Sequence, residues 1–354
     1  MAGIGDALIA TPFIHELSRQ FPEEQIDALV LWRGSRDLLE GNSHLNSIHQ
    51  KNFLESTRAE SLKFLLQLRR EHYDISFNTH PQSRVQYRII ARIINAKTRL
   101  SHLYDCSSWI DRCLINKSIP QDYSLHSVEN NFNLLKLLNR QLISTDPKLE
   151  IFLSQSEHTA AESFIAEKGL PDKIRIGFHV GSGGTKNLAL KRWPLENYRQ
   201  FILKTLERRA EAVALLFGGP QEEHDHAWLT SQIQSDRVIV APTPDLKHAA
   251  ALIQRCHAFV SVDTALMHLA AAVKVPNQIV IEAPTLNKTN EPYRQNFTLV
   301  RNPMVDGRNL DYYRYDGRDI QGSDDHLKQC MASVTVDMVY QALEHSFHLT
   351  PPRK

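Results

Sequence analysis

The sequence predicts an α/β protein made of two tandem domains, each with a parallel sheet covered by helices. Apolar strand-like runs alternate with helical patterns along the chain, and 354 residues exceed what one compact core usually needs. Between the two halves, residues 140–158 lose helical periodicity and include Asp146-Pro147, which is typical of a linker. We therefore expect an N-terminal domain over residues 1–150, a C-terminal domain over 151–335, and a C-terminal helix and tail over 336–354.

The composition is that of an ordinary globular protein. Its 41 basic and 40 acidic residues give a net charge of +1, which argues against a polycation built to bind nucleic acid. The four cysteines form no CxxC pair, so we expect no disulfide framework, no metal site and a reducing cytoplasm. No apolar run reaches the ~18–20 residues of a spanning helix, and the first residues lack the pattern of a signal peptide.

The first half begins differently from an ordinary βα unit. The stretch "MAGIGDALIATPF" leads almost directly into a helix, where a strand would normally come first. Either the sheet lacks this strand or the chain starts further upstream, and we expect the second. The expected strands are 26–32 and 73–78, and the expected helices are 7–21, 61–71, 84–95 and 128–139.

The second half follows the alternation more regularly. Strands are expected at 173–180, 212–218, 237–241, 257–262 and 277–283, with helices from about 195 and at 221–233 and 246–255, after 263, and at 336–345. Three polar loops, 181–192, 218–223 and 263–268, follow strands of this sheet. Because the carboxyl ends of parallel strands share one edge, we expect these loops to converge on one site.

The first of these loops, "HVGSGGTKNLALKRWP", has the composition of an anion-binding loop. The glycines from Gly181 onward let backbone amides approach a ligand, and Lys191 and Arg192 supply cationic donors suited to phosphate oxygens. The spacing matches neither a P-loop nor a GxGxxG fingerprint. An ordinary flexible surface loop is the alternative.

The other two loops also allow a structural and a functional interpretation. Glu222 could accept hydrogen bonds from a ribose, or it could only favour the dipole of the following helix. Asp263 or Thr264 could cap the next helix while its amides hold an anion. His268 lies about one and a half turns further on, where a lone histidine is more often a packing residue than a catalyst.

In the N-terminal half, Asp6 is either a helix cap or a general base. Arg84, Arg88 and Arg92 recur every four residues, so they should share one helix face. That face could bind an anionic acceptor through Arg84 and Arg88, or lie near a membrane surface, or simply be solvated. Trp109-Ile110 could contact lipid or belong to the core.

Taken in order, several segments make the chain resemble glycosyltransferase family 9, the heptosyltransferase family of bacterial lipopolysaccharide synthesis. The resemblance extends from Gly5 to about Leu343. The segments are "GIGDALIATPFIHELSRQFP", "KRWPLENY", "GGPQEE", "SVDTALMHLAAAVKVPNQIVIEAPT" and "QCMASVTVDMVYQAL".

This resemblance implies a GT-B fold, in which two Rossmann-like domains face each other across a cleft. It also implies a metal-independent, inverting transferase without cofactors that uses a nucleotide-sugar donor such as ADP-heptose. Its acceptor would be an anionic glycan or glycolipid. The enzyme would be located in the cytoplasm, or peripherally at the inner face of the inner membrane. Asp6 corresponds to the catalytic base. The donor would be held by Gly181, Ser182, Lys191, Glu222, Asp263, Thr264, Ala265 and His268.

The chain departs from the family pattern at a few positions. Ala265 replaces a usual glycine, and Glu282-Ala283 precede a Pro-Thr turn where Gly-Pro-Thr is common, which could alter donor choice or activity. Two alternatives stay open. The chain could epimerise or hydrolyse a nucleotide sugar without an acceptor, or it could bind a nucleotide sugar without catalysis.

Overall fold

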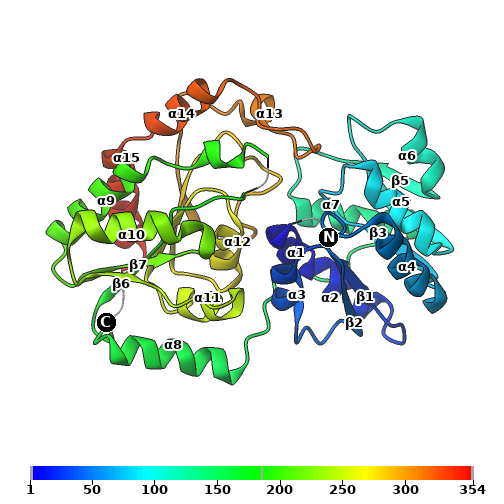
Figure 1. The fold of residues 1–354 in the computed structure, drawn as a ribbon, viewed down its shortest axis with the longest axis horizontal. Coiled ribbons are helices and arrows are strands. Elements are labelled where there is room, and N and C mark those ends of the chain that lie inside the picture. The colour runs from blue at the N-terminus through cyan, green and yellow to red at the C-terminus, as the bar shows by residue number, and fades with distance from the viewer. Residues whose placement is uncertain (1–2, 185, 352–354) are drawn as a thin grey trace. The chain divides into compact units, whose positions relative to one another are not determined.

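A computed structural model describes residues 3–184 and 186–351, and the chain divides into two compact units. The first contains Met1–Phe152 together with Arg314–Arg318, and the second contains Leu153–Tyr313 and Asp319–Lys354. Both units are built from parallel strands and helices (Figure 1). Within the described residues, no helix is both long and apolar enough to cross a membrane.

The first unit has two small parallel sheets. One pairs β1 (Asp27–Val30) with β2 (Ser47–Gln50), and the other has the order β3–β4–β5, which are Ile75–Asn78, Thr98–Leu103 and Lys117–Pro120. Its helices are α1 (Ile4–Ile9), α2 (Thr11–Gln20), α3 (Arg33–Leu39), α4 (Arg58–Leu68), α5 (Val85–Ile94), α6 (Trp109–Leu114) and α7 (Ser127–Asn133). The 3-10 helices η1 (Arg69–Glu71) and η2 (Leu134–Leu138) extend α4 and α7.

Some expectations for this unit need correction. The helix expected at 7–21 is two helices, because the chain changes direction at Ala10, and the helix expected at 128–139 ends as a 3-10 turn. Sequence patterns missed β2, β4, β5, α3 and α6. The sequences of β2 (SIHQ) and β5 (KSIP) are short and mostly polar, so they lack the apolar run that marks a buried strand.

The second unit has one six-stranded parallel sheet in the order β11–β10–β9–β6–β7–β8. These strands are β6 (Ile174–His179), β7 (Ala212–Phe217), β8 (Val238–Val240), β9 (Ala258–Ser261), β10 (Asn277–Ile281) and β11 (Phe297–Val300). From β6 the chain adds β7 and β8 on one side and then returns to add β9 on the other. The strand order therefore reverses between β6 and β9, which is where such sheets usually bind ligands.

Helices cover this sheet, and the helices expected from about 195, at 221–233, at 246–255, after 263 and at 336–345 are confirmed. They are α8 (Gln155–Glu167), η3 (Leu188–Lys191), α9 (Leu195–Arg208), η4 (Pro220–Glu222), α10 (Glu223–Ile233), α11 (Leu246–Ile253), α12 (Ala265–Ala272), α13 (Asn309–Tyr312), α14 (Asp324–Ser333) and α15 (Val336–Leu349). Helix α15 lies beside α9 (Figure 1). Tyr198 and Phe201 of α9 pack with the Trp193 side chain in the core of this unit.

The stretch expected to be a linker is partly helical. Helix α8 starts at Gln155 because Ser154 and Glu157 form a capping box, with the Ser154 amide donating to the Glu157 carboxylate at 2.6 Å. Sequence patterns also missed the elements between β10 and α15, which are β11, α13 and α14.

Candidate functional site

The three polar loops of the second unit meet at the reversal of strand order. The first follows β6, the second follows β7 and the third follows β9. Lys191 of the first loop contacts Asp263 of the third, and Arg192 of the first contacts Glu222 of the second. The expected convergence of the loops is confirmed by these contacts.

Lys191 and Asp263 form a buried ion pair at the centre of this site. The Lys191 Nζ donates to the backbone oxygen of Asp263 at 2.5 Å and to its carboxylate at 3.1 Å. The same carboxylate accepts from Thr285 Oγ1 at 2.7 and 2.8 Å and from Asn290 Nδ2 at 3.2 Å. Asp263 therefore fixes the ammonium in place and does not cap α12.

Thr264 is the residue that caps α12. Its Oγ1 accepts from the Met267 amide and lies 3.0 Å from Nδ1 of His179, the last residue of β6. The imidazoles of His179 and His268 are both buried, and burial is the main cause that lowers the pKa of each to about 3. The Lys191 charge lowers both pKa values further. Both rings are therefore neutral at pH 7.

The loop after β6 packs tightly against the loop after β7. A Cβ atom placed on Gly181 would lie 2.1 Å from Oε1 of Glu222, so any other residue there would have to displace the Glu222 side chain. Arg192 spans the two loops: its Nε donates to Ser182 Oγ at 3.1 Å, and a second nitrogen lies 3.6 Å from Glu222. The other oxygen of Glu222 accepts from the Gly219 amide at 2.9 Å, so this carboxylate also holds its own turn.

Two departures from the family pattern have different surroundings. Ala265 is the first residue of α12 and is partly exposed beside the cap, at the mouth of the site. The Glu282 carboxylate is buried and accepts from the Asn302 amide at 2.7 Å. This hydrogen bond gives Glu282 a structural role in holding the segment after β11.

In the first unit, Asp6 is the third residue of α1, and Gly3 is its N-cap. The expectation that Asp6 could itself be the N-cap is therefore wrong. Its carboxylate accepts from the Gly3 amide at 2.6 Å, as the acid of a capping box does. Burial raises the pKa of Asp6 to about 6. Burial is also the main cause that raises the pKa of Tyr87 to about 12, and the charge of Asp6 adds to it.

The three arginines of α5 and its cap do not share one solvated face. Arg88 is fully buried, lies 3.2 Å from Asp111 and donates to the His102 backbone oxygen at 2.9 Å. The expectation that Arg88 lines an exposed acceptor face is therefore wrong, because Asp111 of α6 neutralises it inside the core. Arg84 is exposed, and its guanidinium donates to the Gly317 backbone oxygen at 3.4 Å.

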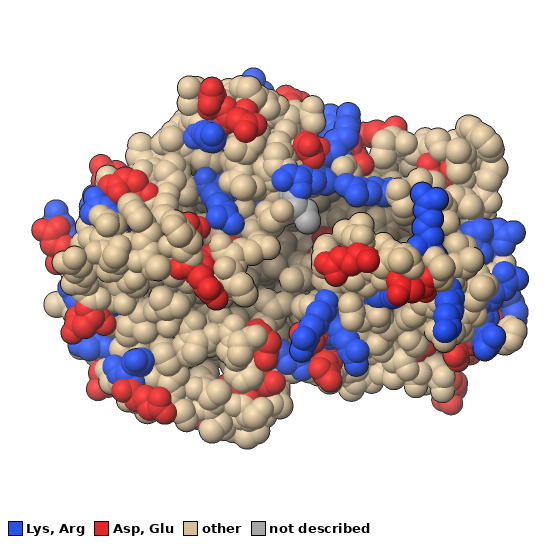
Figure 2. All heavy atoms as spheres, in the orientation of Figure 1, with Lys and Arg blue, Asp and Glu red and all other residues tan. Residues whose placement is uncertain are grey.

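Trp109 and Ile110 are not core residues. Trp109 is 73% exposed and Ile110 is 45% exposed, at the start of α6. Exposed apolar side chains of this size often mark contacts with other molecules. On the face shown in Figure 2, basic and acidic side chains are interspersed over both units.

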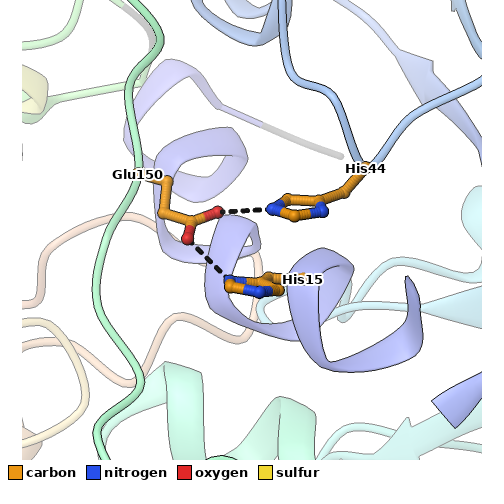
Figure 3. A group of neighbouring side chains, drawn as sticks. All are labelled: His15, His44 and Glu150. Carbon is orange, nitrogen blue, oxygen red and sulfur yellow. Dashed lines mark hydrogen bonds and ion pairs between the residues drawn. The ribbon is translucent and has the colours of Figure 1, made fainter. Parts of the chain in front are cut away.

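Among the described residues, one group of three side chains has ligand atoms close enough to hold a metal ion: His15, His44 and Glu150 (Figure 3). Its geometry argues against that role. The two imidazole rings are stacked with centroids 4.0 Å apart and planes inclined by 12°, so an ion between them would lie outside both ring planes. The Glu150 carboxylate instead lies 2.7 Å from His15 and 3.6 Å from His44, and joins α2 to the segment that leads into the second unit.

Sequence reasoning missed several side chains that contact each other around these loops. These are His179 beside Thr264, and Thr285 and Asn290 on Asp263. The sequence signal for His179 was its position as the last strand residue before the glycine loop. Thr285 and Asn290 lie over 20 residues from Asp263, and no local pattern connects them.

Comparison with known proteins gives one family. The sequence model of glycosyltransferase family 9 (heptosyltransferase) matches residues 61–313. The chain is 24% identical over 285 residues to lipopolysaccharide heptosyltransferase 3 of Escherichia coli strain K12, covering 77% of this chain and 78% of that protein. It is 28% identical over 196 residues to lipooligosaccharide heptosyltransferase 2 of Haemophilus ducreyi, covering 54% of this chain and 52% of that protein.

Solved structures share the fold across both units. A family 9 glycosyl transferase from Veillonella parvula matches with a TM-score of 0.78 at 20% identity, covering 99% of this chain and 96% of that one. The ADP-heptose lps heptosyltransferase II of E. coli matches with a TM-score of 0.73 at 18% identity, covering 99% and 98%. The architecture is therefore GT-B, with two Rossmann-like domains.

Proposed function

The chain belongs to glycosyltransferase family 9, and from this we propose that it transfers heptose from ADP-heptose to an anionic lipopolysaccharide-core acceptor. The enzyme is a glycosyltransferase. The observation that supports a nucleotide-sugar site in the second unit is the buried Lys191–Asp263 pair. It lies where the strand order reverses, among loops that offer backbone amides. The proposed reaction inverts the anomeric configuration and uses no metal ion.

On the donor side, the proposed work is to hold the nucleotide and to stabilise the leaving diphosphate. The Lys191 ammonium carries three N–H donors, and two of them point at Asp263. Held in this way, it would meet developing phosphate charge with little reorganisation, together with amides at the start of α12 and in the loop from Gly181 to Gly184. Ser182 and Ala265 would border the diphosphate, and Glu222 would accept from the ribose.

His268 and Thr264 complete the proposed donor pocket. A neutral imidazole can both donate and accept one hydrogen bond, and the His268 Nδ1 is buried without a hydrogen-bond partner among the described residues. Burying such an atom without a partner costs free energy. A hydroxyl or phosphate oxygen of the bound nucleotide sugar that reaches it would supply the missing hydrogen bond.

On the acceptor side, Asp6 is the proposed general base. It would take the proton from the acceptor hydroxyl as the oxygen attacks the anomeric carbon of the heptose. A carboxylate with a pKa near 6 is a stronger base than an ordinary aspartate and is still mostly ionised at pH 7. Exposed Arg84 would bind an acceptor phosphate, and Trp109 and Ile110 would contact the membrane surface from the cytoplasmic side.

The function is tested by incubating the protein with ADP-heptose and other nucleotide sugars, with and without lipopolysaccharide-core acceptors. Transfer predicts that ADP release from ADP-heptose depends on the acceptor and is unaffected by EDTA. ADP release without acceptor would indicate hydrolysis, and an altered sugar still attached to ADP would indicate epimerisation. Tight donor binding with no release under any condition would indicate a binding protein.

A further inference from the structure

His179 is the last residue of β6, and the strand order of the second unit reverses between β6 and β9. Its Cα pairs with that of Ser261, the last residue of β9. Thr264, three residues after Ser261, lies against the His179 imidazole. The glycine loop begins two residues after His179, at Gly181. His179 therefore lies where the first and the third polar loops leave the sheet.

The backbone and the side chain of His179 are both held in place. The buried Tyr198 of α9 donates from its hydroxyl to the His179 backbone oxygen at 3.1 Å. On the side chain, Nδ1 lies 3.0 Å from Oγ1 of Thr264, and the residue as a whole is 5% exposed. No described residue makes a hydrogen bond to the other ring nitrogen, Nε2. The ring is thus fixed through Nδ1, while Nε2 can take a partner from outside the chain.

The Thr264 hydroxyl decides which nitrogen of His179 carries the proton. Its oxygen already accepts from the Met267 amide, which is the cap of α12. Its single proton needs an acceptor, and the described residues offer one within hydrogen-bond distance, which is Nδ1 of His179. A neutral imidazole that accepts at Nδ1 carries its proton on Nε2. The ring is neutral at pH 7, because burial, and to a smaller extent nearby groups such as Lys191, lower its pKa to about 3.

The two cations of this site are already paired with acids. The Lys191 ammonium donates to the Asp263 carboxylate, and the Arg192 guanidinium lies 3.1 Å from Asp225 and 3.6 Å from Glu222. A diphosphate that enters the site must share these cations with carboxylates, so it needs further N–H donors that no acid occupies. The Nε2–H group of a neutral imidazole is such a donor, and it adds no like charge beside the ammonium.

We propose that His179 is a further donor-site residue, whose Nε2–H group donates to a diphosphate oxygen of the nucleotide sugar. This inference rests on the proposed function. Thr264 would then have two tasks: it caps α12, whose first amides face the same anion, and it sets the tautomer of His179. Because this N–H is oriented before the ligand arrives, it can stabilise the charge that develops on the leaving diphosphate with little reorganisation.

Two substitutions separate the roles of the two ring nitrogens. An Asn amide reaches about as far as Nδ1 and a Gln amide about as far as Nε2, so His179→Gln keeps an N–H where the donor is proposed and His179→Asn removes it. In calorimetry, His179→Asn should bind ADP about tenfold more weakly than the parent chain, and His179→Gln at most about threefold more weakly. His345→Asn, at an exposed position of α15, is the control and should bind ADP like the parent. A purely structural role of His179 predicts the same affinity in both His179 variants.

A second measurement needs no variant that could fail to fold. Heteronuclear NMR with isotope-labelled histidine should show the His179 proton on Nε2 in the free parent chain. ADP should shift the Nε2 resonance, and adenosine, which lacks phosphate, should leave it unchanged. The signals are assigned by their loss in His179→Gln.

Three results overturn the proposal: a proton on Nδ1, an Nε2 resonance that does not respond to ADP although calorimetry shows ADP binding, or equal ADP affinity of His179→Asn and His179→Gln. A parent chain that binds no ADP at all overturns the proposed donor site as well. ADP binding by the parent therefore separates the failure of this inference from the failure of the proposed function.

Discussion

The ammonium of Lys191 is held by both the backbone oxygen and the carboxylate of Asp263, at 2.5 and 3.1 Å, in a part of the second unit that is almost closed to solvent. A charge pair taken out of water is costly unless further hydrogen bonds satisfy it, and here Thr285 and Asn290 supply them. Such a group can be retained for binding rather than for stability, which is what the proposed contact with a diphosphate requires.

Lys191→Ala should therefore weaken ADP binding by about 1.5–3 kcal/mol, because it removes a charge-assisted contact. It should also lower the free energy of unfolding by about 3 kcal/mol, because the Asp263 carboxylate stays buried without its cation. Calorimetry with ADP and urea unfolding measure the two effects. Lys204→Ala is the matched control, since Lys204 pairs with exposed Asp337 at the surface. An unchanged ADP affinity would remove Lys191 from the donor site.

The contact between Gly181 and Glu222 gives a second prediction. Gly181→Ala should lower stability by about 1–3 kcal/mol and weaken donor binding, since the new methyl group would overlap the Glu222 carboxylate and push the two loops apart. Gly219→Ala is the control, because a Cβ there meets no atom within 4 Å. Thermal unfolding and ADP titration compare the two. If both variants have the same Tm and the same ADP affinity, the two loops can move apart without a loss of stability or of donor binding.

Buried His268 should make the second unit sensitive to acid. Its pKa of about 3 in the folded state lies below the ordinary value of 6.5, so the unfolded chain binds a proton first as the pH falls. The stability that this group contributes is complete above pH 6.5 and is lost between about pH 6.5 and 3, at up to about 1.4 kcal/mol per pH unit.

Replacing this histidine should flatten that dependence. His268→Gln should reduce the slope of unfolding free energy against pH, measured by urea unfolding between pH 7 and 4. His224→Gln, at an exposed position of α10, should leave the slope unchanged. Parallel pH curves for His268→Gln and the parent chain would contradict the assignment of His268 as a neutral buried group.

The sequence predicted the sheet of the second unit well, because its strands are continuous apolar runs and its loops carry glycine and charge at their carboxyl ends. It predicted the first unit less well, since β2 and β5 are short and mostly polar. The prediction that Arg88 is exposed was wrong because of Asp111, which lies 23 residues further along the chain and pairs with Arg88 in the core. The four-residue spacing of the arginines predicts which residues share a helix face, but it contains no information about a distant partner that lets one of them be buried. The hydrogen bonds from Thr285 to the Asp263 carboxylate could not be predicted for the same reason.

Arg84 and Arg88 should respond differently to truncation. Arg84→Ala should raise the acceptor KM with donor affinity and stability unchanged, because its exposed guanidinium is the proposed phosphate contact. Arg88→Ala should lower stability by about 3–5 kcal/mol, since it leaves the Asp111 carboxylate buried and unpaired. Steady-state transfer kinetics and thermal unfolding separate the two. A normal acceptor KM in Arg84→Ala would place acceptor binding elsewhere in the first unit.

The last prediction concerns Asp6, which is both a capping-box acid and the proposed base. Asp6→Asn keeps an oxygen that can accept from the Gly3 amide, so α1 should persist. Turnover should nevertheless fall by a factor of about 10²–10⁴, with ADP affinity unchanged, because an amide cannot take the acceptor proton. Glu60→Gln is the matched control, since Glu60 occupies the same capping-box position in α4 and should transfer at the parent rate.

Stability against pH gives Asp6 a second, independent readout. Its folded pKa of about 6 lies above the ordinary 3.8, so the folded chain holds this proton more tightly than the unfolded chain does. The cost of ionising Asp6 is absent below about pH 3.8 and complete above pH 6. Asp6→Asn should therefore be more stable than the parent by about 1–3 kcal/mol at pH 7, and this difference should shrink towards pH 4. Near-parent transfer by Asp6→Asn would make Asp6 a capping-box acid only and would place the base at another residue.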